Sequence, residues 1–444
     1  MQTRIDKYLA KRADLERWPL VAGDTSSLRR VVVIPALAEH DYLDETLASL
    51  AANPEEELRE TLVICVVNNR GPAHTTTDVL ENNQRTLADL ERRVQQPEDG
   101  VRAAYVDAAS PGCELPPKDG VGLARKIGLD WGLAVLRDNG APRGLLLSLD
   151  ADAAVCPEYL SGVRRHFEEH DAWAGVVAYA HRFDGPPGQV AAIVCYEIFL
   201  RYHVLGLRHA GSPYAYSSIG STVVCRADAY AAVAGMNRRQ GGEDFYFLQQ
   251  LAKTGGVDEI PGATVYPSSR ASIRAPFGTG PRVARFLRHE RDEYVLYHPE
   301  GYGVLKEWLE AVTAHAADGA ECLLEKADGI CPQLCAFLAQ NGFAKVWGRL
   351  AANARDESAL LVQFHRWFDG FRTLKLIHHL RDNGFPEQDM LASVRQALRW
   401  FDAEPGDVAW ERLRDDIAEQ QRLLEHLRDL ARRMSGRRHG PGGE

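Results

Sequence analysis

Short apolar runs alternate with amphipathic segments between residues 30 and 266. The runs at residues 31–35, 62–67, 103–106, 145–149 and 175–180 have the length and composition of buried strands. Between them, segments such as residues 42–52 place Leu43, Leu47 and Leu50 on one face, which predicts amphipathic helices. The alternation predicts an α/β fold with a mostly parallel sheet that helices cover on both sides.

The pattern changes near residue 299, after which strand-like runs stop and helix formers dominate. Residues 303–316, 332–353, 358–382, 386–402 and 408–434 have helical patterns. We therefore expect an N-terminal helical extension over residues 1–29, an α/β domain over residues 30–299 and an α-helical C-terminal region over residues 300–434. Residues 435–444 are rich in Gly and charge, which predicts a disordered tail.

The last predicted helix carries a stripe of large aliphatic residues, namely Leu413, Ile417, Leu424 and Leu427. This stripe has two interpretations. It packs on the rest of the same chain, or it forms a short coiled-coil contact in a homodimer.

Two carboxylates follow the predicted strand at residues 145–149. Asp150 and Asp152 stand one residue apart at its exit. In this position one carboxylate can bind a divalent cation directly, while the other binds through water or holds a sugar hydroxyl, and the cation neutralises a diphosphate. The simpler interpretation is local capping of the strand end and of the following turn.

The segments VVVIPALAEHDYLDETLASL, LVICVVNN, GVGLARKIGLD, SLDADAAVCPEYL and GGEDFYFLQQL occur in this order along the chain. This ordered set resembles the family 2 glycosyltransferases, and it covers roughly residues 30–285. The resemblance implies the GT-A fold, a nucleotide-sugar-binding sheet, and a metal-dependent transfer of a sugar to an acceptor hydroxyl. It implies Mg²⁺ or Mn²⁺ as the cofactor and a nucleoside-diphosphate sugar, most simply a UDP-sugar, as the donor.

Carried onto this sequence, the resemblance implies that one set of residues binds the nucleotide-sugar: Pro35, Leu37, Glu39, Asn68, Asn69, Asp107, Arg125, Lys126, Asp150 and Arg274. Asn68 and Asn69 stand where the family usually has an aspartate that reads uracil, so the base stays open. Lys126 replaces the family's usual asparagine. Arg274 lies in a Gly- and Arg-rich stretch, residues 268–286, that suits a lid over a phosphate. A strand-end turn at Asp107 and a solvated helix face at Lys126 are the structural alternatives.

For catalysis the resemblance implies Asp244 as the base that deprotonates the acceptor, with Glu243 as the substitute candidate. Asp152 and Asp150 are the implied metal ligands, and no third ligand is assigned, because residues 268–286 have neither a histidine nor a Q-x-x-R-W element. Inversion by a single displacement is the preferred stereochemistry. The alternatives are a retaining glycosyltransferase, a catalytically silent sugar-nucleotide binder and a haloacid-dehalogenase-like phosphatase, whose D-x-D motif normally opens the domain.

The net charge of −10 argues against a general nucleic-acid binder, which needs a basic face. The most apolar stretch, residues 190–207, contains Glu197, Arg201 and His203. These charges favour a buried or interfacial helix, and we expect a cytoplasmic protein with no transmembrane segment. The eight cysteines are expected to be reduced thiols. Cys322, Cys331 and Cys335 lack a matching Cys or His pair, so a structural metal site there is not predicted.

Overall fold

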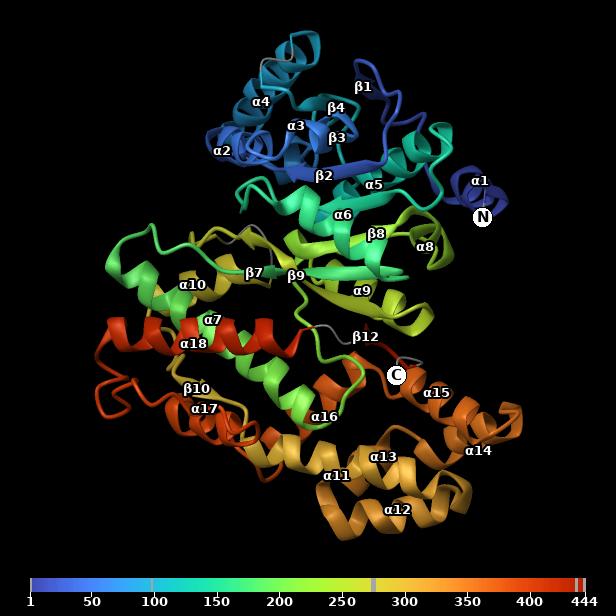
Figure 1. Ribbon diagram of the computed structural model, residues 1–444, viewed down its shortest axis with the longest axis vertical. Coiled ribbons are helices and arrows are strands. Elements are labelled where there is room, and N and C mark those ends of the chain that lie inside the picture. Colours follow the sequence, from blue (N-terminus) through green and yellow to red (C-terminus); the bar gives the residue numbers. More distant parts are fainter. Residues whose placement is uncertain (1, 97–98, 273–276, 436–437, 442–444) are drawn as a thin grey trace. The chain divides into compact units, whose positions relative to one another are not determined.

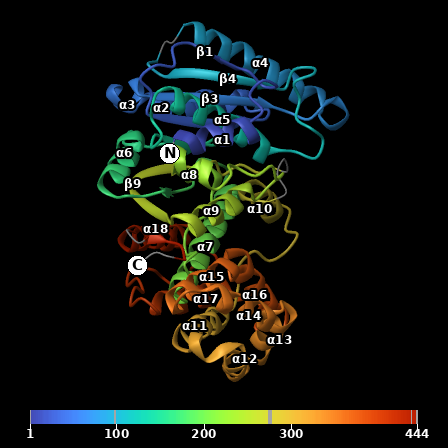
Figure 2. The same ribbon diagram turned by 90° about the vertical axis from the view of Figure 1, so that its right-hand side faces the viewer.

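The computed structural model describes residues 2–96, 99–272, 277–435 and 438–441 (Figure 1, Figure 2). The chain divides into two compact units. Unit 1 comprises Met1–Pro186, Ser218–Ala284 and Ser435–Arg437, and unit 2 comprises Pro187–Ser217, Arg285–Met434 and Arg438–Glu444. Residues Pro187–Ser217 therefore leave the sheet-containing unit and pack with the C-terminal helices, an insertion that the strand-helix alternation does not reveal.

Unit 1 is built on a large mixed sheet with the strand order β1-β4-β3-β2-β5-β8-β7-β9, to which β6 adds by pairing with β9. The pairs β4–β3, β3–β2, β2–β5 and β7–β9 are parallel, and β1, β6 and β8 run antiparallel to their neighbours. The predicted α/β fold with a mostly parallel sheet is confirmed. The strands are β1 (Leu20–Ala22), β2 (Arg30–Ala36), β3 (Thr61–Asn68), β4 (Arg102–Ala108), β5 (Leu145–Ser148), β6 (Ala154–Val155), β7 (Ala174–Tyr179), β8 (Val223–Arg226) and β9 (Val257–Tyr266).

Helices cover both faces of this sheet. They are α1 (Gln2–Arg12), α2 (His40–Ala51), α3 (Glu55–Arg59), α4 (Thr77–Gln95), α5 (Val121–Asp138), α6 (Tyr159–Glu169), α8 (Ala227–Ala232) and α9 (Glu243–Thr254), with the 3-10 turns η1 (Pro72–His74) and η2 (Gly220–Thr222). Helix α10 (Thr279–Leu287) begins in unit 1 and ends in unit 2. Apolar residues of α2, α4 and α6 share one core with alternate residues of the central strands, such as Val32 and Val63.

The opposite face of the sheet is covered by α5, which approaches β2 and β3 closely. A Cβ atom on Gly128 would lie 2.3 Å from Cγ1 of Val33 and 3.0 Å from Cγ2 of Val66. Any larger residue at position 128 would push α5 away from the sheet. The glycine is therefore required for this spacing, and the spacing places the first turn of α5 beside the exit of β5.

The order of the strands fixes where a ligand can bind. From β2 the chain adds β3 and then β4 on one side, and β5 returns to the other side of β2. Such a reversal leaves a crevice at the carboxyl ends of β2 and β5. Glu39 follows β2, and Asp150 and Asp152 follow β5, so the acids predicted from the sequence gather at this reversal point.

Unit 2 is mainly helical and contains a short antiparallel pair, β10 (Val295–Leu296) with β11 (Gln388–Asp389). Its helices are α7 (Pro187–His209), α11 (Pro299–His315), α12 (Gly319–Ile330), α13 (Pro332–Gln340), α14 (Phe343–Asn353), α15 (Glu357–Trp367), α16 (Gly370–Asp382), α17 (Met390–Arg399) and α18 (Ile417–Met434), with the turn η3 (Ala316–Asp318). The patterns at residues 332–353 and 358–382 each become two helices. Gly342 at φ 66° and the N-cap Asp369 make these breaks.

Aromatic side chains form much of the core of unit 2. Rings from α11, α14, α15 and the following turn pack edge to face or stack with centroids 5.4–6.4 Å apart, and their members are Trp308, Phe343, Trp347, Phe364 and Phe368. All five are almost fully buried. This cluster gives the unit a hydrophobic core of its own.

Helix α7 is long and apolar enough to cross a membrane by composition alone, but 67% of its apolar window is buried. Its Glu197 is fully buried and accepts hydrogen bonds from Arg201 and from Arg428 of α18. Leu424 and Leu427 of α18 are also buried within unit 2. The leucines of the stripe therefore pack on their own chain, the first of the two interpretations, and a homodimer stays a prediction.

Two further expectations concern the cysteines and the C-terminal tail. All eight cysteines are free thiols, as expected.

In the tail, β12 (Arg438–His439) is a short strand, and the His439 ring lies 6.0 Å from the ring of Tyr216. The side chain of His439 is 7% exposed. The disordered tail over residues 435–444 stays a prediction.

Candidate active site

Asp150 is held at the exit of β5 by two partners. Its Oδ1 accepts a hydrogen bond from Nη2 of Arg125, and its Oδ2 accepts one from the hydroxyl of Ser221 at 2.5 Å. The side chain is 35% exposed. One edge of the carboxylate is therefore fixed by the protein while the group still faces solvent.

Arg125 is the buried centre of the first ion-pair cluster. Its side chain is 4% exposed and donates to Oε1 of Glu243 at 2.9 Å, to the hydroxyl of Ser148 at 2.5 Å and to the carbonyl of Gly220 at 3.3 Å. Burial opposes the charge, but Asp150 and Glu243 outweigh it and raise the pKa of Arg125 above its ordinary value. A Cβ at Gly220 would lie 2.5 Å from Nη2, so the guanidinium needs glycine there.

Arg270 is the centre of a second cluster. Its Nε donates to Oδ2 of Asp152 at 2.6 Å, and its Nη2 lies 2.5 Å from both carboxylate oxygens of Glu39. The guanidinium carbon also lies 4.1 Å from the ring centroid of Tyr42. Burial disfavours the charge, but Asp152 and Glu39 outweigh it and raise the pKa of Arg270. One arginine thus joins the acid that follows β5 to the acid that follows β2.

Glu243 and Asp244 begin α9, and Gly242 precedes them in the left-handed conformation at φ 69°. Oδ1 of Asp244 accepts a hydrogen bond from the backbone N–H of Phe245 at 2.7 Å. Burial, with the neighbouring charge of Glu243, raises the pKa of Asp244 to about 7, although Arg125 acts in the opposite direction. A carboxylate that titrates near neutral pH is suited to accept and release a proton.

Among the residues that the structure describes, the two clusters together have fewer positive than negative groups. Two guanidinium groups face five carboxyl groups, which belong to Glu39, Asp150, Asp152, Glu243 and Asp244. Carboxylate oxygens are the ligands that Mg²⁺ and Mn²⁺ prefer, and a divalent cation would offset the excess negative charge. The donor types and the charge balance therefore fit the predicted cofactor, with Asp152 and Asp150 as the residues that would hold it.

Asn68 and Asn69 fasten the ends of the strands. Nδ2 of Asn68 donates to the carbonyls of Ala36 and Val66, while Asn69 donates to two loop carbonyls and accepts from Asn83 at 2.8 Å. Asn83 in turn accepts from the backbone N–H of Ala38. These amides connect the exits of β2 and β3, so their observed hydrogen bonds are structural and do not themselves read a base.

Asp107 also has a local role, because its Oδ1 caps the turn after β4 by accepting from the N–H groups of Ala109 and Ser110, both at 2.9 Å. This is the turn alternative that the sequence left open.

Lys126 is not brought to the acids, although it is next to Arg125 in the sequence. Its Nζ bonds Oδ2 of Asp130 at 2.5 Å and the hydroxyl of Tyr8 at 2.8 Å. Consecutive residues on a helix point about 100° apart, so one side chain faces the crevice and the next faces α1. Lys126 therefore ties α5 to α1, and its assignment to the nucleotide-sugar site stays a prediction.

Pro35 is buried within β2, and Leu37 follows the strand as a partly exposed residue beside Glu39. Arg274 lies outside the described residues, so its role stays a prediction. Sequence reasoning assigned no site role to Ser148 or Tyr42 and placed Arg270 only in a basic loop. A serine at a strand end carries no sequence signal, since its partner is more than twenty residues away.

No protein-family model and no curated protein matches this sequence. Solved structures do show similarity to it. S. aureus TarS 1–349 in complex with UDP-GlcNAc is 16% identical over 90% of this chain and 92% of that chain, with a TM-score of 0.35. The mannosyltransferase PcManGT from Pyrobaculum calidifontis in complex with GDP-Man and Mn²⁺ is 16% identical over 91% and 94%, with a TM-score of 0.34.

GalNAc-T7 with UDP, GalNAc and Mn²⁺ is 14% identical over 65% of this chain and 51% of that chain, with a TM-score of 0.35. The chain is thus similar to solved structures that contain nucleotides and nucleotide sugars. Similarity below a TM-score of 0.5 carries no functional argument, and the proposed function depends on the side chains of the site.

Proposed function

We propose that this protein is a metal-dependent glycosyltransferase that moves a sugar from a nucleoside-diphosphate sugar to an acceptor hydroxyl. One observation carries the proposal: five carboxyl groups and two arginines gather where the order of a mostly parallel sheet reverses. A nucleoside-diphosphate donor needs a cation for its phosphates, and an acceptor hydroxyl needs a base. This site offers groups for both tasks.

Asp152 is the residue we expect to hold Mg²⁺ or Mn²⁺ directly. Asp150, whose two oxygens already accept from Arg125 and Ser221, would bind through water or hold a sugar hydroxyl. When bound, the cation supplies charge neutralisation for the departing diphosphate. Glu39, at the exit of β2, lies on the side where the sequence resemblance implies the nucleoside.

Asp244 is the proposed base. The acceptor oxygen bonds to the anomeric carbon, the bond from that carbon to the diphosphate oxygen breaks, and the acceptor proton passes to Asp244. Nucleophile and leaving group lie on opposite sides of the carbon, so the configuration inverts. Arg125 holds Glu243 in place by a hydrogen bond, and the charge of Glu243 in turn raises the pKa of Asp244, so Asp244 is basic enough to accept the proton.

UDP is the donor nucleotide we prefer, on the sequence resemblance alone, and a cytoplasmic location remains a prediction. A retaining transferase would use the same fold with a different displacement, and NMR of the product's anomeric configuration separates the two.

Release of nucleoside diphosphate from UDP- and GDP-sugars, with Mn²⁺ or with EDTA, tests the proposal. Transfer that depends on Mn²⁺ and falls about 10²–10⁴-fold in Asp244→Asn, with donor binding retained, supports it. The matched control is Asp14→Asn, which changes an exposed aspartate of the same unit. A wild-type protein that binds donor and Mn²⁺ but never releases nucleotide would instead be a silent binder.

A further inference from the structure

Arg270 holds both acids that a bound donor would need. Its guanidinium makes three hydrogen bonds, one to Asp152 and two to Glu39, and it lies over the ring of Tyr42. Asp152 is the expected ligand of the cation, and Glu39 lies on the expected nucleoside side. A single arginine side chain therefore binds both the expected metal ligand and the acid expected to contact the nucleoside.

The charges show why this arrangement is stable without a donor. Asp152 and Glu39 have side-chain exposures of 20% and 10%, and two such carboxylates near each other repel unless a cation lies between them. Arg270 is that cation, and its flat guanidinium matches two carboxylates at once. A divalent cation carries twice the charge and prefers the same oxygens.

We propose that Arg270 competes with the divalent cation for Asp152, and that binding of the metal and donor releases Arg270 from both acids. The released guanidinium, at the start of the basic stretch over residues 268–286, is then free to pair with the diphosphate. This inference rests on the proposed function, because it assigns the cation to Asp152. In this role Arg270 is a positioning residue: it prevents cations in the solvent from binding Asp152 and Glu39 until the donor binds.

Binding of Mn²⁺ without nucleotide, measured from the electron paramagnetic resonance signal of the free ion, tests this competition directly. Arg270→Met keeps an unbranched, flexible side chain but removes the charge, and we expect at least tenfold tighter Mn²⁺ binding. Arg270→Lys keeps the charge but loses the planar guanidinium that can bond two carboxylates, and we expect its affinity for Mn²⁺ to lie between those of wild type and Arg270→Met. Circular dichroism confirms that each variant is folded.

The matched control is Arg238→Met, which removes an arginine paired with Asp119 elsewhere in unit 1. It changes the net charge equally, and its Mn²⁺ affinity should stay within twofold of wild type. Equal or weaker Mn²⁺ binding by Arg270→Met, in a wild type that does bind Mn²⁺, overturns the competition and leaves the proposed function intact. If neither protein binds Mn²⁺, the metal dependence fails and the competition fails with it.

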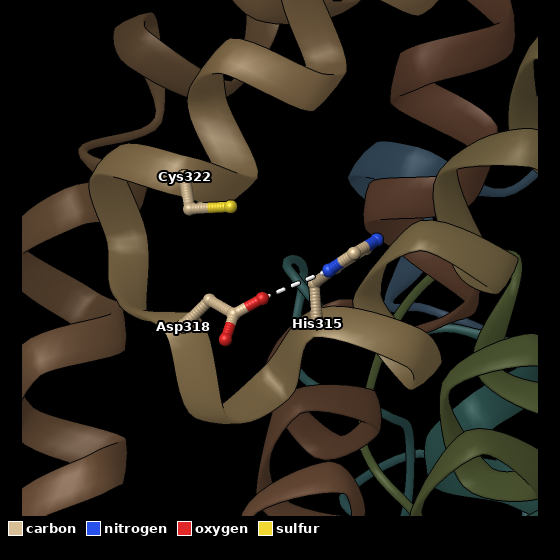
Figure 3. Close-up of side chains that lie close together, drawn as sticks. All are labelled: His315, Asp318 and Cys322. Atoms are coloured by element: carbon tan, nitrogen blue, oxygen red, sulfur yellow. Dashed lines mark hydrogen bonds and ion pairs between the residues drawn. The ribbon is translucent and has the colours of Figure 1, made fainter.

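A separate cluster in unit 2 carries a second inference. His315 ends α11, Asp318 ends the turn η3, and Cys322 lies in the first turn of α12, and their side chains face a common space (Figure 3). One ligand atom from each residue lies within 4.8 Å of the others. Gly319, at φ 88°, makes the turn that brings the three together.

The side chain of Asp318 does not cap the helix that follows this turn. It is the N-cap residue of α12, where an aspartate ordinarily accepts from a backbone N–H and contributes about 1 kcal/mol. No such bond forms, and its Oδ2 instead lies 2.9 Å from Nδ1 of His315. The carboxylate therefore points towards the histidine and the thiol and away from the helix end.

We propose that His315, Asp318 and Cys322 form a binding site for Zn²⁺ or a similar borderline cation, with water as the fourth ligand. Nitrogen, oxygen and sulfur together suit Zn²⁺, whereas Mg²⁺ and Mn²⁺ prefer oxygen alone. The side chains of His315 and Asp318 are 33% and 53% exposed, so an ion can reach them from the solvent. Binding would join α11 to α12.

Cobalt(II) provides the test, because a thiolate ligand gives a charge-transfer band that the all-oxygen site of unit 1 cannot give. We expect this band in the wild-type protein, its loss in Cys322→Ser, and its retention in Cys335→Ser, which removes another partly exposed cysteine. Zinc binding measured against a competing chelator should weaken at least tenfold in His315→Ala. A wild-type protein without the band, or a band that survives in Cys322→Ser, overturns the site.

Discussion

The ionisation of Asp244 makes a quantitative prediction about stability. Folding raises the pKa of this carboxyl from 3.8 to about 7, through burial first and the charge of Glu243 second. A carboxyl whose pKa is raised on folding stabilises the folded protein while it is protonated. That stabilisation is lost as the pH rises from 3.8 through about 7. Asp244→Asn removes the titration and keeps an oxygen that can accept from the N–H of Phe245.

The magnitude follows from linkage. Each pKa unit corresponds to about 1.4 kcal/mol, so the raised pKa costs the folded state about 4 kcal/mol at pH 8, where Asp244 is ionised, and about 2 kcal/mol at pH 5, where it is protonated. Between these two pH values the wild-type protein therefore loses about 2 kcal/mol of stability through this group, and the variant does not.

Urea-induced unfolding at pH 5, 6, 7 and 8 measures this difference. The free energy of unfolding of Asp244→Asn minus that of wild type should rise by about 2 kcal/mol from pH 5 to pH 8, with most of the rise below pH 7. Asp14→Asn, at an exposed position, should give a difference that does not change with pH. A pH-independent difference for Asp244→Asn as well would refute the raised pKa. The same titration predicts that kcat/KM rises with pH towards a plateau above about 7.

Three further substitutions test the site and both units. Asp152→Asn should abolish Mn²⁺ binding and lower kcat/KM at least about a hundredfold, as equilibrium dialysis and steady-state rates would show; full activity would remove this residue from the metal site. Gly128→Ala should cost about 1–3 kcal/mol by urea unfolding, because its new methyl group meets a β2 valine, whereas Gly348→Ala has open space and should be neutral or stabilising. Arg428→Met should cost about 3 kcal/mol, since it leaves the buried charge of Glu197 with one partner fewer, and an unchanged melting temperature would contradict that role.

Local patterns determined the secondary structure of unit 1. The strands at β2, β3, β4, β5 and β7 and the helix at α2 agree with the sequence within a few residues. These elements are readable because the periodicity of apolar residues depends only on neighbours along the chain. The same holds for the acids at the exit of β5, because a polar pair directly after an apolar run marks a strand end. The breaks inside the helices of unit 2 were missed, since a single glycine or N-cap residue changes a helical pattern very little.

Contacts between distant residues could not be read in this way. The sequence placed Arg125 and Lys126 together, but the direction of each side chain on α5 sends one to Glu243 and the other to Asp130. It also gave no reason to join Arg270 to Glu39, which stands 231 positions earlier.

The sequence by itself therefore determined the central strands of the sheet, several of the helices, and where along the chain the acids stand. Only the tertiary structure decided which arginine neutralises which acid, that Asp244 is buried enough to titrate near neutral pH, and that α7 joins the C-terminal helices. The physical reason is that charge pairing and desolvation depend on distance and burial in space, which the spacing of residues along a chain does not contain.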